Sequence, residues 1–434
     1  MKRGRHVAPG GIRGAEAHGQ RARIRSRSLP VSRSAVDTAP WDSGDVAKEF
    51  GLQSYRPAAY LDQWVWIRLA RAAAGKPDAP GDPELLQALI DAAEAGVAFP
   101  LAWTHYIETQ SVKSPRQRQD IANVMASISH FRTIRTGRDL LRNQLLIAMH
   151  EQFGRPTFRP EKLDPLGVGV YWAFQGVERV LQVHDAAGNI IDPDQFPREM
   201  RIRATQGFEC QVMAGPRDEE LGLLRGQYGY KPEATVEAGR GRLEWEREFV
   251  DLLVDTPPTD PAELRVWIQA REVVHEYLEL LVGVFQEYGL PLRQLTGGSD
   301  GNDPGRSRAF ITGFFDRLPS VRVAVDLKLA VHRNNQRGWE QNDVYDTDAM
   351  SIAVPYCDVV VADKAVVDAL GRVKAGEQHG TLITGKLDEL AEVLPEMVRH
   401  AQMLPDPSGW EVFAPGVGFS PVTTEQLVEG MRSQ

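Results

Sequence analysis

The feature that most constrains the fold is a run of β-branched residues that ends in an acid. Residues 359–361 are all valine, and Ala362 and Asp363 follow them. An unbroken run of this kind is typical of a parallel strand that is buried on both faces. Ligands of open α/β sheets gather at the carboxyl ends of such strands. Asp363 is therefore a candidate ligand for a hard divalent cation, or else it only caps the helix that follows.

The composition is that of a globular protein. With 434 residues, of which 42% are hydrophobic, the chain can bury one large core or two modest ones. No stretch approaches the run of about 18 apolar residues that a membrane helix needs. The two cysteines, Cys210 and Cys357, are too few for a disulfide framework and lack zinc-ligand spacing. We therefore expect a soluble protein in a reducing compartment, the cytoplasm, with no membrane association.

The net charge of −9 hides an asymmetry between the start of the chain and the rest. Residues 1–35 carry nine basic side chains against Glu16 alone, a net charge of +8, so the remainder carries −17. An acidic body does not favour broad electrostatic capture of duplex nucleic acid. The basic segment is interpreted as a disordered arm or a misassigned start; a nucleic-acid tether and a transit peptide are the alternatives.

The first ordered part of the chain alternates strands with helices. Strands are expected at 58–62 and 97–101, and helices at 82–94, 103–111 and 115–129. Asp82 is the predicted N-cap of the first of these helices, and Ser114 begins a capping-box pattern before the last. This β-α-α-β-α order implies a parallel sheet flanked by helices.

The middle of the chain changes character. Asp260 begins a long amphipathic helix that reaches about Tyr288, and we interpret the region around it as a mainly helical insertion. A helix near 320–336, a strand at 381–383 and a helix from Leu387 to about His400 follow later. The predicted segments are a flexible basic arm (1–54), the first half of the core (55–150), the insertion (151–300), the second half of the core (301–400) and a C-terminal extension (401–434).

Four acids occupy positions that such a sheet brings together. Asp62 ends the first strand and Asp363 ends the valine strand, while Glu108 lies on the helix after the second strand. Asp346 lies at the start of a short helix, and Asp343 precedes it by one turn. Each acid alone has an ordinary explanation as a helix cap or a solvated side chain. Their common placement indicates a shared site.

These residues resemble the four-acid pattern of PIN-like nucleases. The resemblance is strongest to a subgroup with a Leu-Asp-Gln-x-x-Trp-Ile start and an Asn-Asp-x-x-Asp…Pro-Tyr-Cys-Asp end. This chain matches those motifs at Leu61–Ile67, Asn342–Asp346 and Pro355–Asp358. The resemblance covers about 55–130 and 305–400. It implies a three-layer α/β/α sandwich with a central, mainly parallel sheet. One departure is that Val361 and Ala362 stand where these nucleases often have threonine or serine near the last acid.

The resemblance also implies metal-dependent hydrolysis of phosphodiester bonds. Oxygen-only ligands favour Mg²⁺ or Mn²⁺, and such ions activate water and stabilise the attacking and leaving oxygens. Asp62, Asp346 and Asp363 are expected to hold the first ion, and Glu108 to orient a water or a second ion. Asp343 is a plausible fifth ligand. Asp358 lies at the opposite end of the strand and is not expected to take part.

Basic and aromatic residues near these acids are weaker candidates. Lys328, His332, Arg333 and Arg337 form a predicted basic face for substrate phosphates, with an ordinary helix surface as the alternative. Arg116 and Arg118 are further phosphate candidates. His105 is expected to be structural more often than functional. Trp64 and Trp66 can stack a base, although packing is the commoner role. The residues offered for substrate binding are therefore Lys328, His332, Arg333 and Arg118.

The absence of several motifs narrows the alternatives. The chain has no dinucleotide-binding or phosphate-binding glycine loop, no serine-hydrolase elbow and no zinc-protease motif. The favoured hypothesis is a ribonuclease acting on single-stranded RNA, with a toxin-like or defence role by resemblance. The alternatives are a catalytically weak scaffold that binds a protein or RNA partner through the insertion, and a structure-selective DNA nuclease.

Overall fold

The protein is described by a computed structural model. The structure describes residues 56–155, 163–177, 183–184, 190–191, 198–228, 231–297, 303–334 and 338–404. The predictions for the basic arm and for most of the C-terminal extension fall outside these ranges. All described residues belong to one compact unit. No helix within the described ranges has both the length and the apolar character that crossing a membrane requires.

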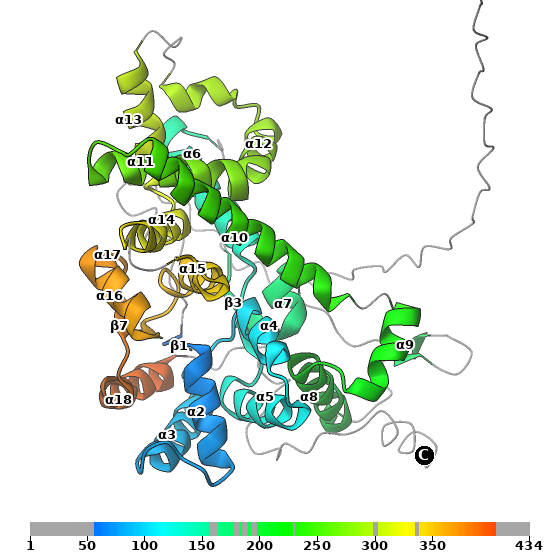
Figure 1. Cartoon of the computed structure of the whole chain (residues 1–434). Coiled ribbons are helices and arrows are strands. Elements are labelled where there is room, and N and C mark those ends of the chain that lie inside the picture. The colour runs from blue at the N-terminus through cyan, green and yellow to red at the C-terminus, as the bar shows by residue number, and fades with distance from the viewer. Residues whose placement is uncertain are drawn as a thin grey trace, which may run out of the picture. The chain divides into compact units, whose positions relative to one another are not determined.

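A small parallel sheet carries the valine run (Figure 1). The strands β1 (Ala59–Leu61), β6 (Val359–Val361) and β7 (Leu382–Thr384) are paired in the order β1-β6-β7, and both pairs are parallel. The valine strand is thus the central one of the three, as its apolar composition predicts. The expected strands at 58–62 and 381–383 are also confirmed, within one or two residues at each end.

The predicted strand at 97–101 is wrong as a regular strand. The segment makes only two isolated parallel bridges, which join Ala98 to Ala58 and Leu101 to Thr133. Pro100 lies between the two bridges. Proline has no N–H to donate and interrupts a ladder of hydrogen bonds. The segment nevertheless extends the sheet, because it links β1 to the strand that follows.

Two further strands continue the pairing beyond this segment. β2 (Arg132–Ile134) pairs in antiparallel fashion with β3 (Leu166–Val168). Since Leu101 bridges to β2, backbone pairing is continuous from β7 through β1 to β3. β3 lies inside the region predicted to be a helical insertion, so that region also contributes to the sheet.

Helices in the first half of the chain match the sequence pattern closely. They are α2 (Gln63–Ala73), α3 (Asp82–Glu94), α4 (Trp103–Ser111), α5 (Pro115–Ser129) and α6 (Gly137–Phe153). The Ser114 side chain accepts from the Gln117 N–H and caps α5, as predicted. Asp82 is not the cap of α3, because it lies inside the first turn and Gly81 is the capping residue. Its carboxylate instead accepts hydrogen bonds from Arg68.

The second half of the core supplies five further helices. They are α14 (Pro319–His332), α15 (Gln341–Ala353), α16 (Lys364–Arg372), α17 (Ala375–His379) and α18 (Leu387–Met403). Asp363 caps α16 by accepting the Val366 N–H at 2.8 Å.

Alternate residues of the strands face different layers of helices. Ala59 and Leu61 pack against α2, α3, α5 and α18, whereas Tyr60 packs against α14, α15 and α16. In Figure 1, α2, α3 and α18 lie below the strands, and α14 and α15 lie above them. This alternation follows from the two-residue repeat of a β-strand. The result is a mostly helical α/β fold with helices on both faces of a small sheet.

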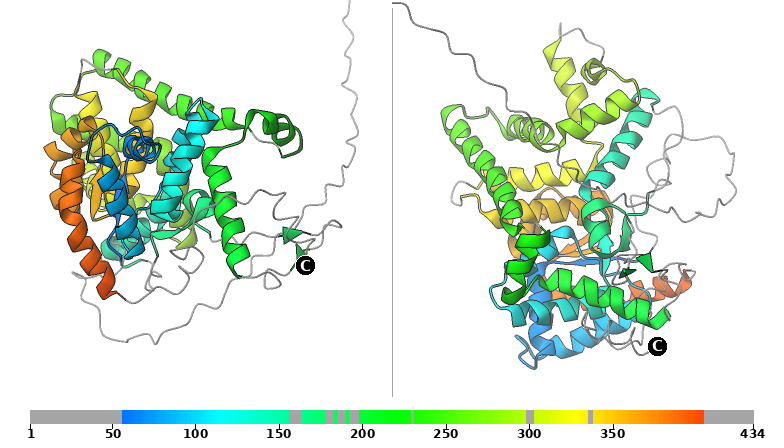
Figure 2. Two further views of the ribbon diagram at one scale, coloured as in Figure 1. Left: turned by 90° about the horizontal axis from the view of Figure 1, so that it is seen from below. Right: turned by 90° about the vertical axis from the view of Figure 1, so that its right-hand side faces the viewer.

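Helices also dominate the described part of the middle region, as predicted. They are α7 (Gly169–Gln175), α8 (Arg198–Ala214), α9 (Asp218–Tyr228), α10 (Pro232–Asp255), α11 (Pro261–Glu272) and α12 (Leu278–Glu287), and α13 (Pro304–Phe315) follows at the start of the predicted second half. The predicted long helix from Asp260 is confirmed, although a π-helical turn, Val273–Tyr277, separates α11 from α12. A short hairpin of β4 (Val183–His184) and β5 (Ile190–Ile191) completes the region. Figure 2 shows α10 as a single long helix, and it contacts α15 of the second half.

Candidate functional site

The end of β1 is held firmly where Asp62 leaves the sheet. The Leu61 carbonyl accepts two side-chain hydrogen bonds, from Trp66 Nε1 at 2.8 Å and from His105 Nε2 at 2.9 Å. The Asp62 N–H donates to the Val361 carbonyl of β6 at 3.0 Å. Asp62 Oδ1 accepts the Gln63 N–H at 2.6 Å and so caps α2. These contacts fix the Asp62 carboxylate at the carboxyl edge of the sheet.

His105 is a structural residue. It is fully buried, and its Nδ1 accepts the Ala102 N–H at 2.8 Å. Nε2 must therefore carry the proton that it donates to Leu61. Burial lowers the pKa of His105 to about 4, so its ring is neutral at physiological pH. The expectation that His105 is structural fits this arrangement, and its role is to position the residue before Asp62.

Asp363 lies beside Asp62 because their strands are neighbours. The Asp363 N–H bonds to the Asp62 carboxylate, and the charge of Asp363 raises the pKa of that carboxyl group. Asp363 itself is exposed and caps α16. The helix cap, which was the simpler interpretation of this residue, is therefore present, and the residue also lies within electrostatic range of Asp62.

Asp346 and Asp343 lie one turn apart on α15. Asp343 is buried, and its Oδ2 accepts the Glu340 N–H at 2.8 Å, so it caps the helix. Asp346 is half-buried. Asp343 is near enough that its charge is one of the causes that raise the pKa of Asp346. Asp343 thus lies at the edge of the site with a capping role of its own.

The four acids Asp62, Glu108, Asp346 and Asp363, here called the acid cluster, influence one another's ionisation. Burial raises the pKa of Asp62 to about 6, with the Gln63 N–H opposing and the charge of Asp363 adding to the shift. Burial, and then the charge of Asp62, raise the pKa of Glu108 to about 8. Burial, followed by the charges of the other three acids, raises that of Asp346 to about 8. Folding has therefore gathered carboxylates that lie up to 301 positions apart in the sequence.

The chemistry of the donor set suits a hard cation. All four members offer carboxylate oxygens, which Mg²⁺ and Mn²⁺ prefer, and the raised pKa values of Asp62, Glu108 and Asp346 indicate that their negative charge is poorly solvated. Among the residues that the structure describes, no group of three or more His, Cys, Asp or Glu side chains is arranged so that it could hold a metal ion. That Asp62, Glu108, Asp346 and Asp363 together hold a metal ion therefore stays a prediction.

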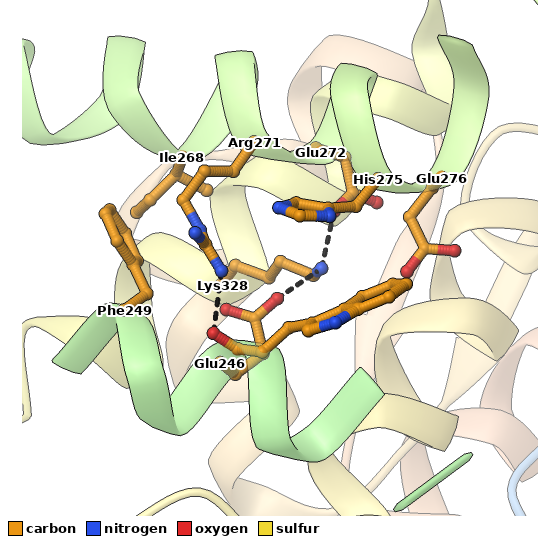
Figure 3. A pocket seen from close by; sticks show the side chains of 9 residues that line it. Glu246, Phe249, Ile268, Arg271, Glu272, His275, Glu276 and Lys328 are labelled. Atoms are coloured by element: carbon orange, nitrogen blue, oxygen red, sulfur yellow. Dashed lines mark hydrogen bonds and ion pairs between the residues drawn. The ribbon is translucent and has the colours of Figure 1, made fainter. Parts of the chain in front are cut away.

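The prediction that Lys328 and His332 bind substrate is wrong. Both side chains are buried. Lys328 Nζ forms ion pairs with Glu246 and Glu272, and His332 Nε2 lies 2.9 Å from Glu246 Oε2. Figure 3 shows Lys328 between the two glutamates, beside α10 and α11. Acids on α10 and α11 therefore pair with these two side chains of α14, and the two helices cover them.

The prediction for Arg118 is also wrong. Its guanidinium donates to three backbone carbonyls, those of Val112, Ala214 and Pro216, at 2.6–3.1 Å, and only 9% of the residue is exposed. Arg118 therefore ties α5 to the end of α8. Arg333 and Arg116 are exposed, and their roles in substrate binding stay predictions. Asp358 accepts the Ala58 N–H at the entrance of β6, the opposite end of the strand from the acid cluster, as predicted.

Several residues near the cluster were missed by the sequence argument. Trp103 at the start of α4 and Tyr345 on α15 are in edge contact, with ring centroids 6.2 Å apart. Arg242 of α10 pairs with Asp348 and Glu276. Tyr345 could have been noticed as the neighbour of Asp346, whereas Arg242 lies 106 positions from Asp348 and gives no local signal. Comparisons with models of protein families, with curated proteins and with solved structures found no match.

Proposed function

We propose that the protein is a Mg²⁺- or Mn²⁺-dependent nuclease with a PIN-like sandwich fold, acting on single-stranded RNA. The observation that carries the proposal is the acid cluster, in which burial and then the charges of neighbouring members raise the pKa values of Asp62, Glu108 and Asp346. Crowded carboxylates of this kind are stabilised when a cation neutralises them. The helices on both faces of the parallel sheet support the sandwich interpretation.

Each acid of the cluster has a proposed role that follows from its position in the fold. Asp62 and Asp363, at the ends of adjacent strands, present carboxylates from a rigid sheet edge. Asp346 supplies a third from α15, and the role proposed for Glu108 of α4 is to orient a water or a second ion. A bound cation supplies acidity to such a water and stabilises the charge on the attacking and leaving oxygens. His105 and Trp66 hold the Leu61 carbonyl and thereby keep Asp62 in place.

The test is cleavage of labelled RNA and DNA oligonucleotides, single-stranded and duplex, with Mg²⁺, Mn²⁺ or EDTA. We expect Asp62→Asn and Asp346→Asn to lower the rate by at least about 100-fold, and EDTA to abolish cleavage. Asp358→Asn is a matched control, since it changes an acid of the same sheet at the other end of β6 and keeps an oxygen that can accept the Ala58 N–H. Full activity in both variants, or cleavage that persists in EDTA, contradicts the proposal. Preferential cleavage of duplex DNA instead indicates a structure-selective DNA nuclease.

A scaffold without cleavage is a second candidate function, and one observation favours it. Both Asp62 and Asp363 accept backbone hydrogen bonds as helix caps, a role that needs no cation. In this case the protein binds RNA or a protein partner through the middle region. RNA binding that is equal in Mg²⁺ and in EDTA, with no cleavage in any metal, distinguishes this function from the nuclease.

A further inference from the structure

A cavity of about 280 Å³ lies beside the acid cluster, among helices of both halves and of the middle region. Its apolar walls include Trp103 from α4, Leu141 from α6 and Leu280 from α12. Its volume is close to the lower end of the range for small-molecule sites, about 300–1,000 Å³. The cavity therefore has room for one planar ring system and not for a duplex.

The cavity and the acid cluster are linked through α4 and α15, although none of the four acids lines the cavity. Trp103 lines the cavity and begins α4, the helix that carries Glu108. Its ring contacts the ring of Tyr345, which precedes Asp346 on α15. Three residues of α15 also line the cavity, namely Asp348, Ser351 and Ile352. Burial, and then the charges of Glu108 and Asp348, raise the pKa of Tyr345, so this side chain lies near both the acid cluster and the cavity.

The polar side of the cavity is organised around Arg242. Its guanidinium holds both oxygens of Asp348, at 2.6 and 2.8 Å, and Oε1 of Glu276, at 2.7 Å. Arg242 binds Glu276 through Oε1, so Oε2 is the oxygen of this partly exposed carboxylate that a ligand can reach. The π-helical turn that contains Glu276 and Tyr277 brings both residues to the cavity wall. Such turns occur frequently at functional sites.

The charge of the lining decides the class of ligand. Three carboxylates, those of Asp348, Glu276 and Glu279, face two guanidinium groups, those of Arg138 and Arg242. A net negative lining disfavours a phosphate inside the cavity. It favours an uncharged group that carries hydrogen-bond donors, and the aromatic wall favours a flat one. Unpaired bases, which stack on aromatic side chains and are bound through their polar edges, fit this description.

We propose that this cavity binds one unpaired nucleobase of the substrate strand, with an amino group of the base donating to Glu276. The proposal deepens, and for the identity of the substrate rests on, the nuclease function proposed above. Cytosine, adenine and guanine carry an exocyclic amino group and uracil does not. The site therefore discriminates against uracil, because that base presents a carbonyl oxygen where cytosine presents its amino group, and the Glu276 carboxylate cannot accept a hydrogen bond from it.

The test measures binding of free nucleosides, which requires neither cleavage nor a metal ion. Cytidine and uridine are closely matched probes of the same size, because they differ only in the group at C4, an amino group or a carbonyl oxygen, and in the proton that uridine carries at N3. Each is titrated into the full chain in EDTA and followed by ligand-observed NMR. We expect cytidine to bind about tenfold or more tightly than uridine.

Two variants of α12 test the location of binding. Leu280→Trp adds an indole at the cavity wall and is expected to abolish cytidine binding. Leu278→Trp changes a residue of the same helix that is 42% exposed and does not line the cavity, and it is expected to bind cytidine normally. Circular dichroism of both variants confirms that they are folded.

The outcomes separate this proposal from the nuclease function. Equal affinity for cytidine and uridine, or cytidine binding that persists in Leu280→Trp, overturns the base-binding site. A protein that cleaves RNA but binds neither nucleoside supports the nuclease function and overturns the base-binding site. Cytidine binding that is lost in Leu280→Trp, in a protein that never cleaves, retains the site and refutes the nuclease.

Discussion

Replacing Lys328 distinguishes a structural cation from a substrate-binding one. Its ammonium group lies between Glu246 and Glu272, and the three side chains are 8%, 11% and 2% exposed. Lys328→Met removes the charge, keeps most of the side-chain volume and leaves two buried carboxylates without their cation. Breaking a buried ion pair by removing one partner is destabilising by about 3–5 kcal/mol. We expect a loss of unfolding free energy of this size and a melting temperature lower by roughly 5 °C or more.

The assay is equilibrium unfolding in urea, followed by circular dichroism and tryptophan fluorescence. A second change, Glu272→Gln, removes one of the two unpaired charges, so Lys328→Met with Glu272→Gln is expected to recover part of the loss. The control is Lys364→Ala, which breaks an exposed pair with Asp368 and is expected to leave the transition unchanged. Unchanged stability in Lys328→Met together with weaker RNA binding refutes this reasoning and restores the substrate-binding role.

Two further predictions concern the acid cluster and its support. Because Asp346 and Glu108 have pKa values of about 8 in the folded chain and ordinary values of 3.8 and 4.5, the folded state binds more protons between these limits. Metal-free protein is therefore expected to lose stability as the pH rises from about 4 to 8, and the loss should be less steep in Asp346→Asn. Mg²⁺ is expected to restore the stability at pH 8. Thermal melts in EDTA and in Mg²⁺ measure this, and a melting temperature that does not change with pH contradicts it. His105→Ala is expected to lower the free energy of unfolding by about 1–3 kcal/mol, because the Leu61 carbonyl loses a hydrogen-bond donor. It is also expected to lower the cleavage rate while the pH–rate profile keeps its shape near pH 6.5, since the buried ring has a pKa of about 4. Loss of a titration from that part of the profile shows instead that His105 acts as an acid or base.

The parts of the fold that sequence predicts well are those with local causes. The valine run, the Ser114 cap and the long helix from Asp260 each depend on residues within a few positions of one another, and all three are present. The segment 97–101 was mispredicted because apolar character alone does not show that Pro100 interrupts the ladder. Asp82 was misassigned because its partner, Arg68, lies 14 positions away on another helix.

The same distinction explains which site residues were placed correctly. Asp62 and Asp363 end buried strands, so topology alone predicts that they share a sheet edge. Lys328 and His332 also form a pattern on one helix, but their role depends on what covers that helix. The covering residue is Glu246, which lies 82 positions from Lys328, and a helical periodicity cannot show which distant acid will neutralise a basic face.

Most of the basic residues that were expected to bind phosphates are paired within the fold, so a nucleic-acid substrate needs another source of electrostatic attraction. The chain after residue 35 carries a net charge of −17, and Lys328, His332 and Arg118, the cations expected to bind phosphates, are engaged within the fold. A polyanion approaching the acid cluster therefore meets repulsion unless a divalent cation is bound there first. For the proposed nuclease we therefore expect the metal to govern substrate binding as well as cleavage. The affinity for RNA should rise with Mg²⁺ concentration even in Arg333→Ala. An affinity that does not depend on Mg²⁺ but falls in Arg333→Ala would show instead that the protein's own side chains bind the phosphates.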